Sequence, residues 1–238
     1  MDIKEIDILG DDIDNHWYYK SKALAVSKVL QPYKKDTIFD IGAGSAFFSK
    51  YLIKNSGVKE SWCVDIAYDS EYDEQYAEGL IHYREECPEV EPDLTLFVDV
   101  LEHIDDDEAF LKSYVEKAPK GSYFFISVPA FKFLWSQHDV FLGHKRRYTL
   151  KNLENLVENS SLCPVNSFYY FGSVFPLAVL TRMADNLFSK KDTPKSQLQR
   201  HSKFVNSFLS FLCTQETKIM QKNRFFGLSA MCIAYKKD

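Results

Sequence analysis

Short apolar runs alternate with longer amphipathic segments over the first two thirds of the chain. The runs that predict strands cover residues 37–41, 61–66, 80–83, 93–100 and 122–129. Three of them, at 37–41, 93–100 and 122–129, are almost continuously apolar, which is typical of central strands buried on both faces. Strands that alternate with helices predict βαβ units and a parallel sheet covered by helices on both sides.

Amphipathic periodicity predicts the helices, which cover residues 17–33, 45–54, 106–118 and 149–160, with a weaker pattern at 69–79. Pro32 ends the first helix, and Thr149 is placed to cap the last one. A polar and aromatic loop spans residues 129–148, and two further strands are expected at 165–172 and 228–237. The pattern therefore predicts an α/β fold with a doubly wound sheet.

Residues 173–227 interrupt this alternation. They contain two apolar helical patterns, at 174–188 and 203–220, separated by the polar linker SKKDTPKSQLQR. Because the segment lies between two strands of the sheet, we expect a helical cap inserted before the last strand. We thus predict one domain over 1–238, with an N-terminal helical lid at 14–32 and a cap at 173–227.

Composition narrows the class of protein. The 238 residues are 45% hydrophobic and carry a net charge of −5, which excludes wholesale disorder and gives no general attraction to nucleic acid. Five scattered cysteines with no CxxC pair indicate reduced thiols in a cytoplasmic protein, and no metal is expected. No apolar run reaches the length of a membrane span. The apolar faces of the cap leave peripheral membrane contact as an alternative.

The stretch DIGAGSA carries the first candidate chemistry. A strand, a Gly-x-Gly turn and a helix let a ligand approach the backbone closely at Gly42 and Gly44. In dinucleotide sites such a turn faces a pyrophosphate, but the carboxylate of Asp40 disfavours an anion and favours a cationic ammonium. Asp65 ends the next strand, where an acid can accept both ribose hydroxyls. An amino acid joined to a nucleoside, as in S-adenosylmethionine, satisfies all three features.

These motifs resemble those of class I S-adenosylmethionine-dependent methyltransferases. DIGAGSA is similar to the acidic-x-Gly-x-Gly-x-Gly motif of that family, with Ala46 in place of the third glycine, and DLTLFVDVLEH is similar to its fourth-strand motif. The segments HWYYKSKA and VPAFKFLWSQHDVFLGHKRRYT resemble a bacterial subgroup of unassigned substrate. The resemblance implies a Rossmann-like sheet with an antiparallel last strand, and S-adenosyl-L-methionine as cofactor.

The resemblance and the positions of the motifs give the candidate site. The residues expected to bind the cofactor are Asp40, Gly42, Ala43, Gly44, Asp65, Ile66, Asp99, Val100 and, from the lid, Tyr19. Trp135, Arg147 and Tyr148 lie in the loop at 129–148, which follows a central strand and overhangs the opening of the same site. They are predicted to contact the substrate. Methyl transfer to a hydroxyl needs a base, for which His103, His138 and His144 are the candidates.

We therefore predict transfer of a methyl group to a small-molecule or glycan- or lipid-linked acceptor, on oxygen. The sequence leaves the oligomeric state open. Two alternatives are a catalytically silent module that binds the cofactor and, less favoured, an NAD-dependent oxidoreductase. The oxidoreductase would need a glycine near position 46 and an apolar residue at position 40, and both are absent. A nucleic-acid acceptor is not expected, because the fourth strand ends in DVLEH and the net charge is negative.

Overall fold

The computed structural model describes residues 10–188 and 202–237, which build an eight-stranded sheet with the order β3-β4-β2-β1-β5-β6-β8-β7. The strands are β1 (Thr37–Ile41), β2 (Glu60–Val64), β3 (Tyr72–Tyr76), β4 (Gly79–Arg84), β5 (Leu94–Val98), β6 (Tyr123–Pro129), β7 (Leu162–Tyr170) and β8 (Ser229–Lys236).

Parallel pairing dominates the centre of the sheet. Strand β1 pairs in parallel with β2 and β5, and the same orientation extends to β4 on one side and β6 on the other. Strand β8 runs antiparallel to both β6 and β7. The prediction of a Rossmann-like doubly wound sheet with an antiparallel last strand is confirmed.

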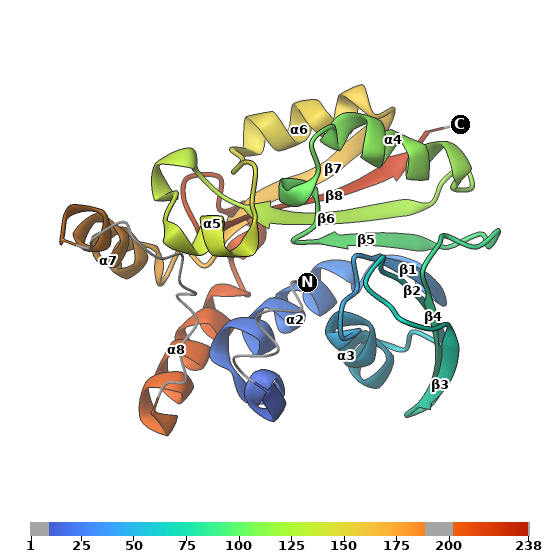
Figure 1. Cartoon of the computed structure of the whole chain (residues 1–238), viewed down its shortest axis with the longest axis horizontal. Coiled ribbons are helices and arrows are strands. Elements are labelled where there is room, and N and C mark those ends of the chain that lie inside the picture. The colour runs from blue at the N-terminus through green and yellow to red at the C-terminus, as the bar shows by residue number, and fades with distance from the viewer. Residues whose placement is uncertain (1–9, 189–201, 238) are drawn as a thin grey trace.

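Helices cover both faces of the sheet, with α4 and α6 on one side and α2, α3 and α8 on the other (Figure 1). Their bounds are α2 (Trp17–Leu30), α3 (Phe47–Ser56), α4 (Asp107–Lys117), α5 (Gln137–Leu142), α6 (Leu150–Asn159), α7 (Phe175–Phe188) and α8 (Lys203–Glu216). Each face encloses its own apolar core. Alternation along β1 places Ile38 in the core beneath α2 and α3, and Phe39 in the core beneath α4.

One predicted element is wrong. The weak helix expected at 69–79 is the edge strand β3, which forms an antiparallel hairpin with β4. Tyr72 stacks on Tyr83 across the hairpin, and the Tyr83 hydroxyl donates to Glu74 at 2.6 Å. The acidic stretch is rich in residues that also suit helices. Cross-strand partners decide its conformation, and they lie outside a local pattern.

The two predicted cap helices are present as α7 and α8, and the linker between them lies outside the described residues. Helix α8 lies beside α2, where the Asn206 side chain accepts a hydrogen bond from the Trp17 backbone N–H at 2.8 Å. At its other end Glu216 accepts the backbone N–H groups of Gly172 and Ser173, at 2.7 and 2.9 Å. The described residues contain no helix both long and apolar enough to cross a membrane.

Candidate functional site

The loops that follow β1, β2, β5 and β6 meet at the carboxyl edge of the sheet, which is where open α/β sheets bind their ligands. Gly42 and Gly44 begin the turn after β1 with φ values of 66° and 55°, a region that favours glycine. A Cβ on Gly42 would lie 2.7 Å from Cγ2 of Val100, in the loop after β5. The turn therefore needs glycine here for both conformation and space.

Ala46 departs from the glycine pattern more than the sequence indicates. An alanine suits a helix, but Ala46 is the residue before α3 and has a left-handed φ of 58°. A non-glycine residue in this region carries a cost of roughly 1–2 kcal/mol. The local fold holds Ala46 in this strained conformation at the base of the candidate site.

Replacing Ala46 by glycine is expected to raise the free energy of unfolding by up to about 1 kcal/mol. The gain is the relief of the left-handed strain, reduced by the greater freedom of glycine in the unfolded chain. Urea unfolding followed by circular dichroism measures the change. The control is Ala77→Gly in the β3–β4 turn, where φ is also positive at 49°. If Ala46→Gly lowers the free energy of unfolding while Ala77→Gly does not, the backbone at Ala46 is not strained.

Asp40, near the end of β1, is buried and faces α3. Its carboxylate accepts the Ser49 hydroxyl at 2.6 Å, and Ser49 in turn accepts a hydrogen bond from Ser61 at 2.7 Å. Burial raises the pKa of Asp40 to about 6, against the opposing effect of the Ser49 hydrogen bond. Burial therefore disfavours the charged form of Asp40, which a neighbouring cationic group would favour.

Asp65 follows β2 and is joined directly to the glycine turn. One carboxylate oxygen accepts the Gly44 backbone N–H at 2.8 Å, and the other accepts that of Ala67 at 3.0 Å. Tyr68 closes the same corner, because its hydroxyl donates to the Gly44 carbonyl at 2.8 Å. The acid and the turn therefore form one preorganised unit, and the remaining acceptor positions of Asp65 are open to ligand hydroxyls.

Asp99, directly after β5, is paired with a lysine that the sequence analysis missed. Lys22 of α2 is fully buried and donates to both carboxylate oxygens of Asp99, at 2.6 Å to Oδ1. Burial lowers the pKa of Lys22, but the Asp99 carboxylate and Tyr18 together raise it above its usual value. The pair fixes the Asp99 carboxylate, whose side chain remains about a quarter exposed.

The loop after β6 is organised around the buried carboxylate of Asp139 in α5. One oxygen accepts Nδ1 of His144 at 2.9 Å and Nε of Arg147 at 2.6 Å, and the other caps α5 at Ser136. Arg147 also donates to the Ala130 carbonyl at 3.0 Å. These bonds lower the pKa of Asp139 below its ordinary value, although burial acts in the opposite direction.

The basic residues of this loop are neutralised by acids. Lys145 pairs with Asp105, and Arg146 donates to Asp107 at 2.7 Å. The Tyr148 hydroxyl also donates to Asp107, at 2.7 Å. Arg147 and Tyr148 were predicted to contact the substrate, but both side chains are buried and anchor the loop. The half-buried Trp135 lies in the same loop, and its contact with a substrate stays a prediction.

Two of the three predicted histidines lie together. The rings of His103 and His144 are perpendicular, with centroids 4.8 Å apart. Nε2 of His144 faces Glu102 Oε1 at 4.0 Å. His138 has a pKa lowered to about 3 by burial and by the charge of Arg182, so it is a weak base at neutral pH. His103 and His144 are therefore the two candidates for a general base.

The remaining residues predicted to bind the cofactor surround the turn. Ala43 is buried within it, and Ile66 is 90% exposed beside Asp65, where it is accessible to a ligand. Tyr19 of α2 is buried against Phe47, at the start of α3, with ring centroids 5.6 Å apart. This packing links the N-terminal helix to the turn, and closure of that helix over a ligand stays a prediction.

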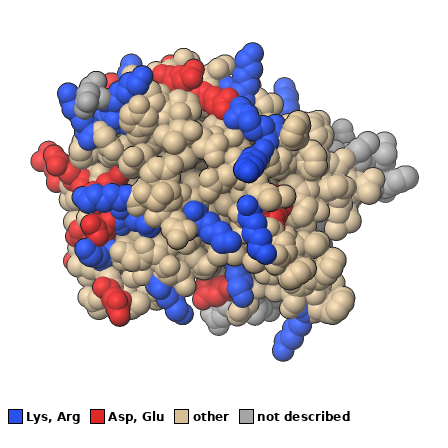
Figure 2. All heavy atoms as spheres, turned by 180° about the vertical axis from the view of Figure 1, so that it is seen from behind, with Lys and Arg blue, Asp and Glu red and all other residues tan. Residues whose placement is uncertain are grey.

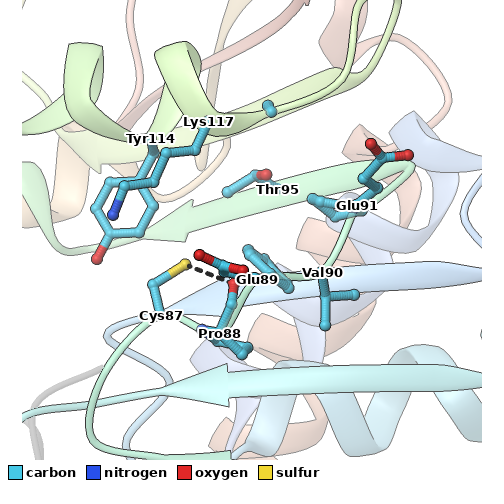
Figure 3. Close-up of a pocket in the computed structure, with 11 residues that line it drawn as sticks. Cys87, Pro88, Glu89, Val90, Glu91, Thr95, Tyr114 and Lys117 are labelled. Carbon is cyan, nitrogen blue, oxygen red and sulfur yellow. Dashed lines mark hydrogen bonds between the residues drawn. The ribbon is translucent and has the colours of Figure 1, made fainter.

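A cavity of about 470 Å³ lies away from these residues, under α4 (Figure 3). Tyr114 and Lys117 of α4 form one wall, and the loop from Cys87 to Glu91 forms the other. None of the predicted cofactor or substrate residues lines it.

On the face opposite to that of Figure 1, Lys and Arg lie scattered among neutral and acidic residues (Figure 2). That distribution is unlike the basic stripe of a nucleic-acid interface.

Comparison with known proteins defines the fold. The chain is similar to a chain from the complex between the Haloferax volcanii Trm112 methyltransferase activator and a candidate methyltransferase, with a TM-score of 0.57 and 13% identity over 99% of this chain and 94% of that one. A candidate methyltransferase from Bacillus halodurans gives a TM-score of 0.53 and 12% identity, with 90% of this chain and 99% of that chain covered.

Human N-acetylserotonin methyltransferase, solved in complex with S-adenosylmethionine, gives a TM-score of 0.52 at 12% identity. The match covers 93% of this chain and 53% of that one. No family model and no curated protein matches the sequence. The chain thus has the class I fold of S-adenosylmethionine-dependent methyltransferases.

The sequence analysis missed Lys22, Glu102 and Asp139 as site residues. A signal was present for Lys22, which lies on the apolar side of an amphipathic helix where lysine is unusual unless it is paired. Glu102 and Asp139 carry no comparable signal, because acids in loops are ordinarily solvated.

Proposed function

We propose that the chain is a methyltransferase that uses S-adenosylmethionine and methylates oxygen on a small-molecule or glycan- or lipid-linked acceptor. The observation that carries the proposal is the hydrogen bond between Asp65 and the Gly44 backbone N–H at 2.8 Å. This bond holds the Asp65 carboxylate, the proposed acceptor for ribose hydroxyls, beside a turn that only glycine fits at Gly42. The buried Asp40 carboxylate lies at the end of the strand that leads into the turn.

The residues fit this cofactor better than a dinucleotide. The buried Asp40 carboxylate would be repelled by a pyrophosphate and attracted by an ammonium group. The Asp99 carboxylate, which Lys22 fixes, is a second acceptor for the charged amino-acid end of the cofactor. Asp65 accepts hydroxyl donors, and the exposed Ile66 offers apolar surface for a base.

The bound cofactor would supply a methyl group already activated by a positive sulfur. The remaining task of the chain is to orient the acceptor and to exclude water. Transfer to a hydroxyl also needs removal of one proton. His103 would accept it, because it lies in the turn after β5 at the same edge. His144, whose Nδ1 is held by Asp139, is the second candidate for this role.

Titration with S-adenosylhomocysteine tests the cofactor. Isothermal calorimetry is expected to give one site for S-adenosylhomocysteine and no binding of NAD. Asp65→Ala should weaken the affinity by about tenfold or more, because it removes the acceptor of the ribose hydroxyls and loosens the turn. The control Asp69→Ala removes an exposed acid four residues away and should leave the affinity unchanged. Tight NAD binding, or no binding of either ligand, would refute the proposal.

The affinity should depend on the ionisation of Asp40. Because burial raises its pKa to about 6, the carboxyl is mostly neutral at pH 5 and mostly ionised at pH 7. An ammonium group binds the ionised form, so the affinity for S-adenosylhomocysteine should rise by up to about tenfold over this range. Asp40→Asn, which stays neutral, should bind more weakly and show a flat profile. A wild-type affinity that falls as pH rises would contradict the role of Asp40.

The acceptor needs a separate assay. Transfer of tritium from labelled S-adenosylmethionine can be measured with a panel of phenols, sugars and amines. Methylation of hydroxyl compounds, lost in His103→Ala while S-adenosylhomocysteine still binds, is the expected outcome. Turnover of amines alone would contradict the oxygen target without affecting the cofactor assignment.

A further inference from the structure

We propose that Glu102, His103 and His144 form a binding site for a divalent first-row transition-metal ion, at the edge of the candidate active site. Each residue offers one ligand atom, and these atoms all lie within 4.8 Å of one another. Two imidazoles and a carboxylate form a donor set suited to zinc, iron or cobalt rather than to magnesium or calcium. The sequence pattern predicts no metal site, but the fold brings residues of two separate loops together.

Glu102 provides the strongest argument. It is fully buried, and neither of its carboxylate oxygens has a hydrogen-bond partner among the described residues. A buried carboxylate without a partner is costly, and coordination of a cation removes that cost. Nε2 of the His144 imidazole lies 4.0 Å from Glu102 Oε1. Asp99 and Lys22 also act on Glu102 electrostatically. A ligand atom of Glu102 thus lies within 4.8 Å of ligand atoms of both histidines.

His144 is already held as metal-binding histidines usually are. Its Nδ1 is engaged by the buried Asp139 at 2.9 Å, which leaves Nε2 free to face Glu102 and the proposed ion. A carboxylate on the far nitrogen of a ligating histidine fixes the ring and its tautomer. Arg147 and Ser136 hold Asp139 in turn, so the support extends into the loop.

The backbone fixes the two loops against each other. The Lys145 N–H donates to the Glu102 carbonyl at 2.7 Å, and the Asp139 carbonyl accepts the His144 N–H at 2.9 Å. Zinc–ligand distances of about 2.0–2.2 Å place the ligands of a tetrahedral site roughly 3.4 Å apart. Closing from 4.8 Å to that separation is a shift of about 1.4 Å, which is within the reach of small side-chain rotations.

The ion would leave at least one coordination position for an exogenous ligand, because the chain supplies three. This role rests on the proposed function: an oxygen of the acceptor would bind there, and its hydroxyl would lose its proton more readily. With the ion bound, His103 would be a ligand and not the base, so the proton would pass to water. Binding of the ion itself does not depend on methyl transfer. Metal titration and cofactor titration therefore fail independently.

Calorimetric titration of the chelator-treated full chain with zinc chloride tests the site. One ion per chain is expected, and cobalt chloride should give the visible absorption bands of a four- or five-coordinate site, whereas magnesium chloride gives no heat. Glu102→Gln and His144→Ala should each weaken zinc binding by about 100-fold. Asp139→Asn should weaken it about 10–100-fold and alter the cobalt spectrum, as expected for a residue that orients a ligand.

His82→Ala is the matched control. His82 also lies between two carboxylates, those of Glu60 at 3.0 Å and Asp73 at 2.8 Å, but in the β3–β4 hairpin. This variant should bind zinc as the wild type does. Circular dichroism checks that every variant is folded, and Glu102→Gln preserves the shape of the side chain if His144→Ala does not fold. Absence of zinc and cobalt binding, or equal affinity in wild type, Glu102→Gln and His144→Ala, would overturn the proposal and leave an ion-pair network only.

Discussion

Asp99→Asn is expected to lower the free energy of unfolding by about 3 kcal/mol. The change leaves the ammonium group of Lys22 fully buried without the carboxylate that compensates its charge. Removing one partner of a buried ion pair costs about 3–5 kcal/mol, and the lower figure suits a carboxylate that is partly exposed. Chemical denaturation measures the loss, and the affinity for S-adenosylhomocysteine should fall with it.

The control for this experiment is Asp93→Asn. Asp93 also accepts a hydrogen bond from a lysine, Lys34, at 2.6 Å, but the Lys34 side chain is 71% exposed. An exposed pair contributes about 0–1 kcal/mol, so the two variants should differ clearly. The double variant Lys22→Met with Asp99→Asn should recover much of the stability, because no charge remains buried. Equal effects of Asp99→Asn and Asp93→Asn would refute the importance of the buried pair.

Gly42→Ala is expected to reduce the affinity for S-adenosylhomocysteine by at least about tenfold and to destabilise the fold by about 2–4 kcal/mol. The added methyl group would lie 2.7 Å from Val100 Cγ2, in a conformation with φ of 66° that alanine rarely adopts. The conformational cost is roughly 1–2 kcal/mol, and relief of the clash moves the turn away from β5. Calorimetry and chemical denaturation measure the two effects.

Two variants separate strain from crowding. Gly57→Ala has a φ of 73° with nothing within 4 Å of the new Cβ, so it should cost the conformational part alone and leave binding intact. Val100→Ala combined with Gly42→Ala should recover part of the affinity, because the clash is removed. If Gly42→Ala binds S-adenosylhomocysteine as tightly as Gly57→Ala does, the close contact between the turn and the loop after β5 is irrelevant to the site.

The parts of the site that the sequence predicts are those encoded locally. Asp40, Gly42 and Gly44 lie within five residues at the end of β1 and in the turn after it, and Asp65 follows the neighbouring strand, so strand order alone brings them together. Apolar runs likewise predict the central strands, because a strand that is buried on both faces is apolar at nearly every position.

The remainder depends on contacts between segments distant in sequence. Lys22 reaches Asp99 across 77 positions, and Glu102 meets His144 only when the loop after β6 folds back. The same loop conformation buries Arg147 and Tyr148. In the sequence their polar groups are candidates for substrate contact, but in the structure they donate hydrogen bonds to Asp139 and Asp107. A linear pattern identifies the residue types and not the partners that neutralise them.

A crystal structure of the complex with S-adenosylhomocysteine would show directly where the cofactor binds. We expect the ribose hydroxyls on Asp65, the backbone of Gly42 and Gly44 against the ligand, and the amino group close to the carboxylates of Asp40 or Asp99. Density for the nucleoside in the cavity under α4, or anywhere else away from the glycine turn, would contradict this expectation.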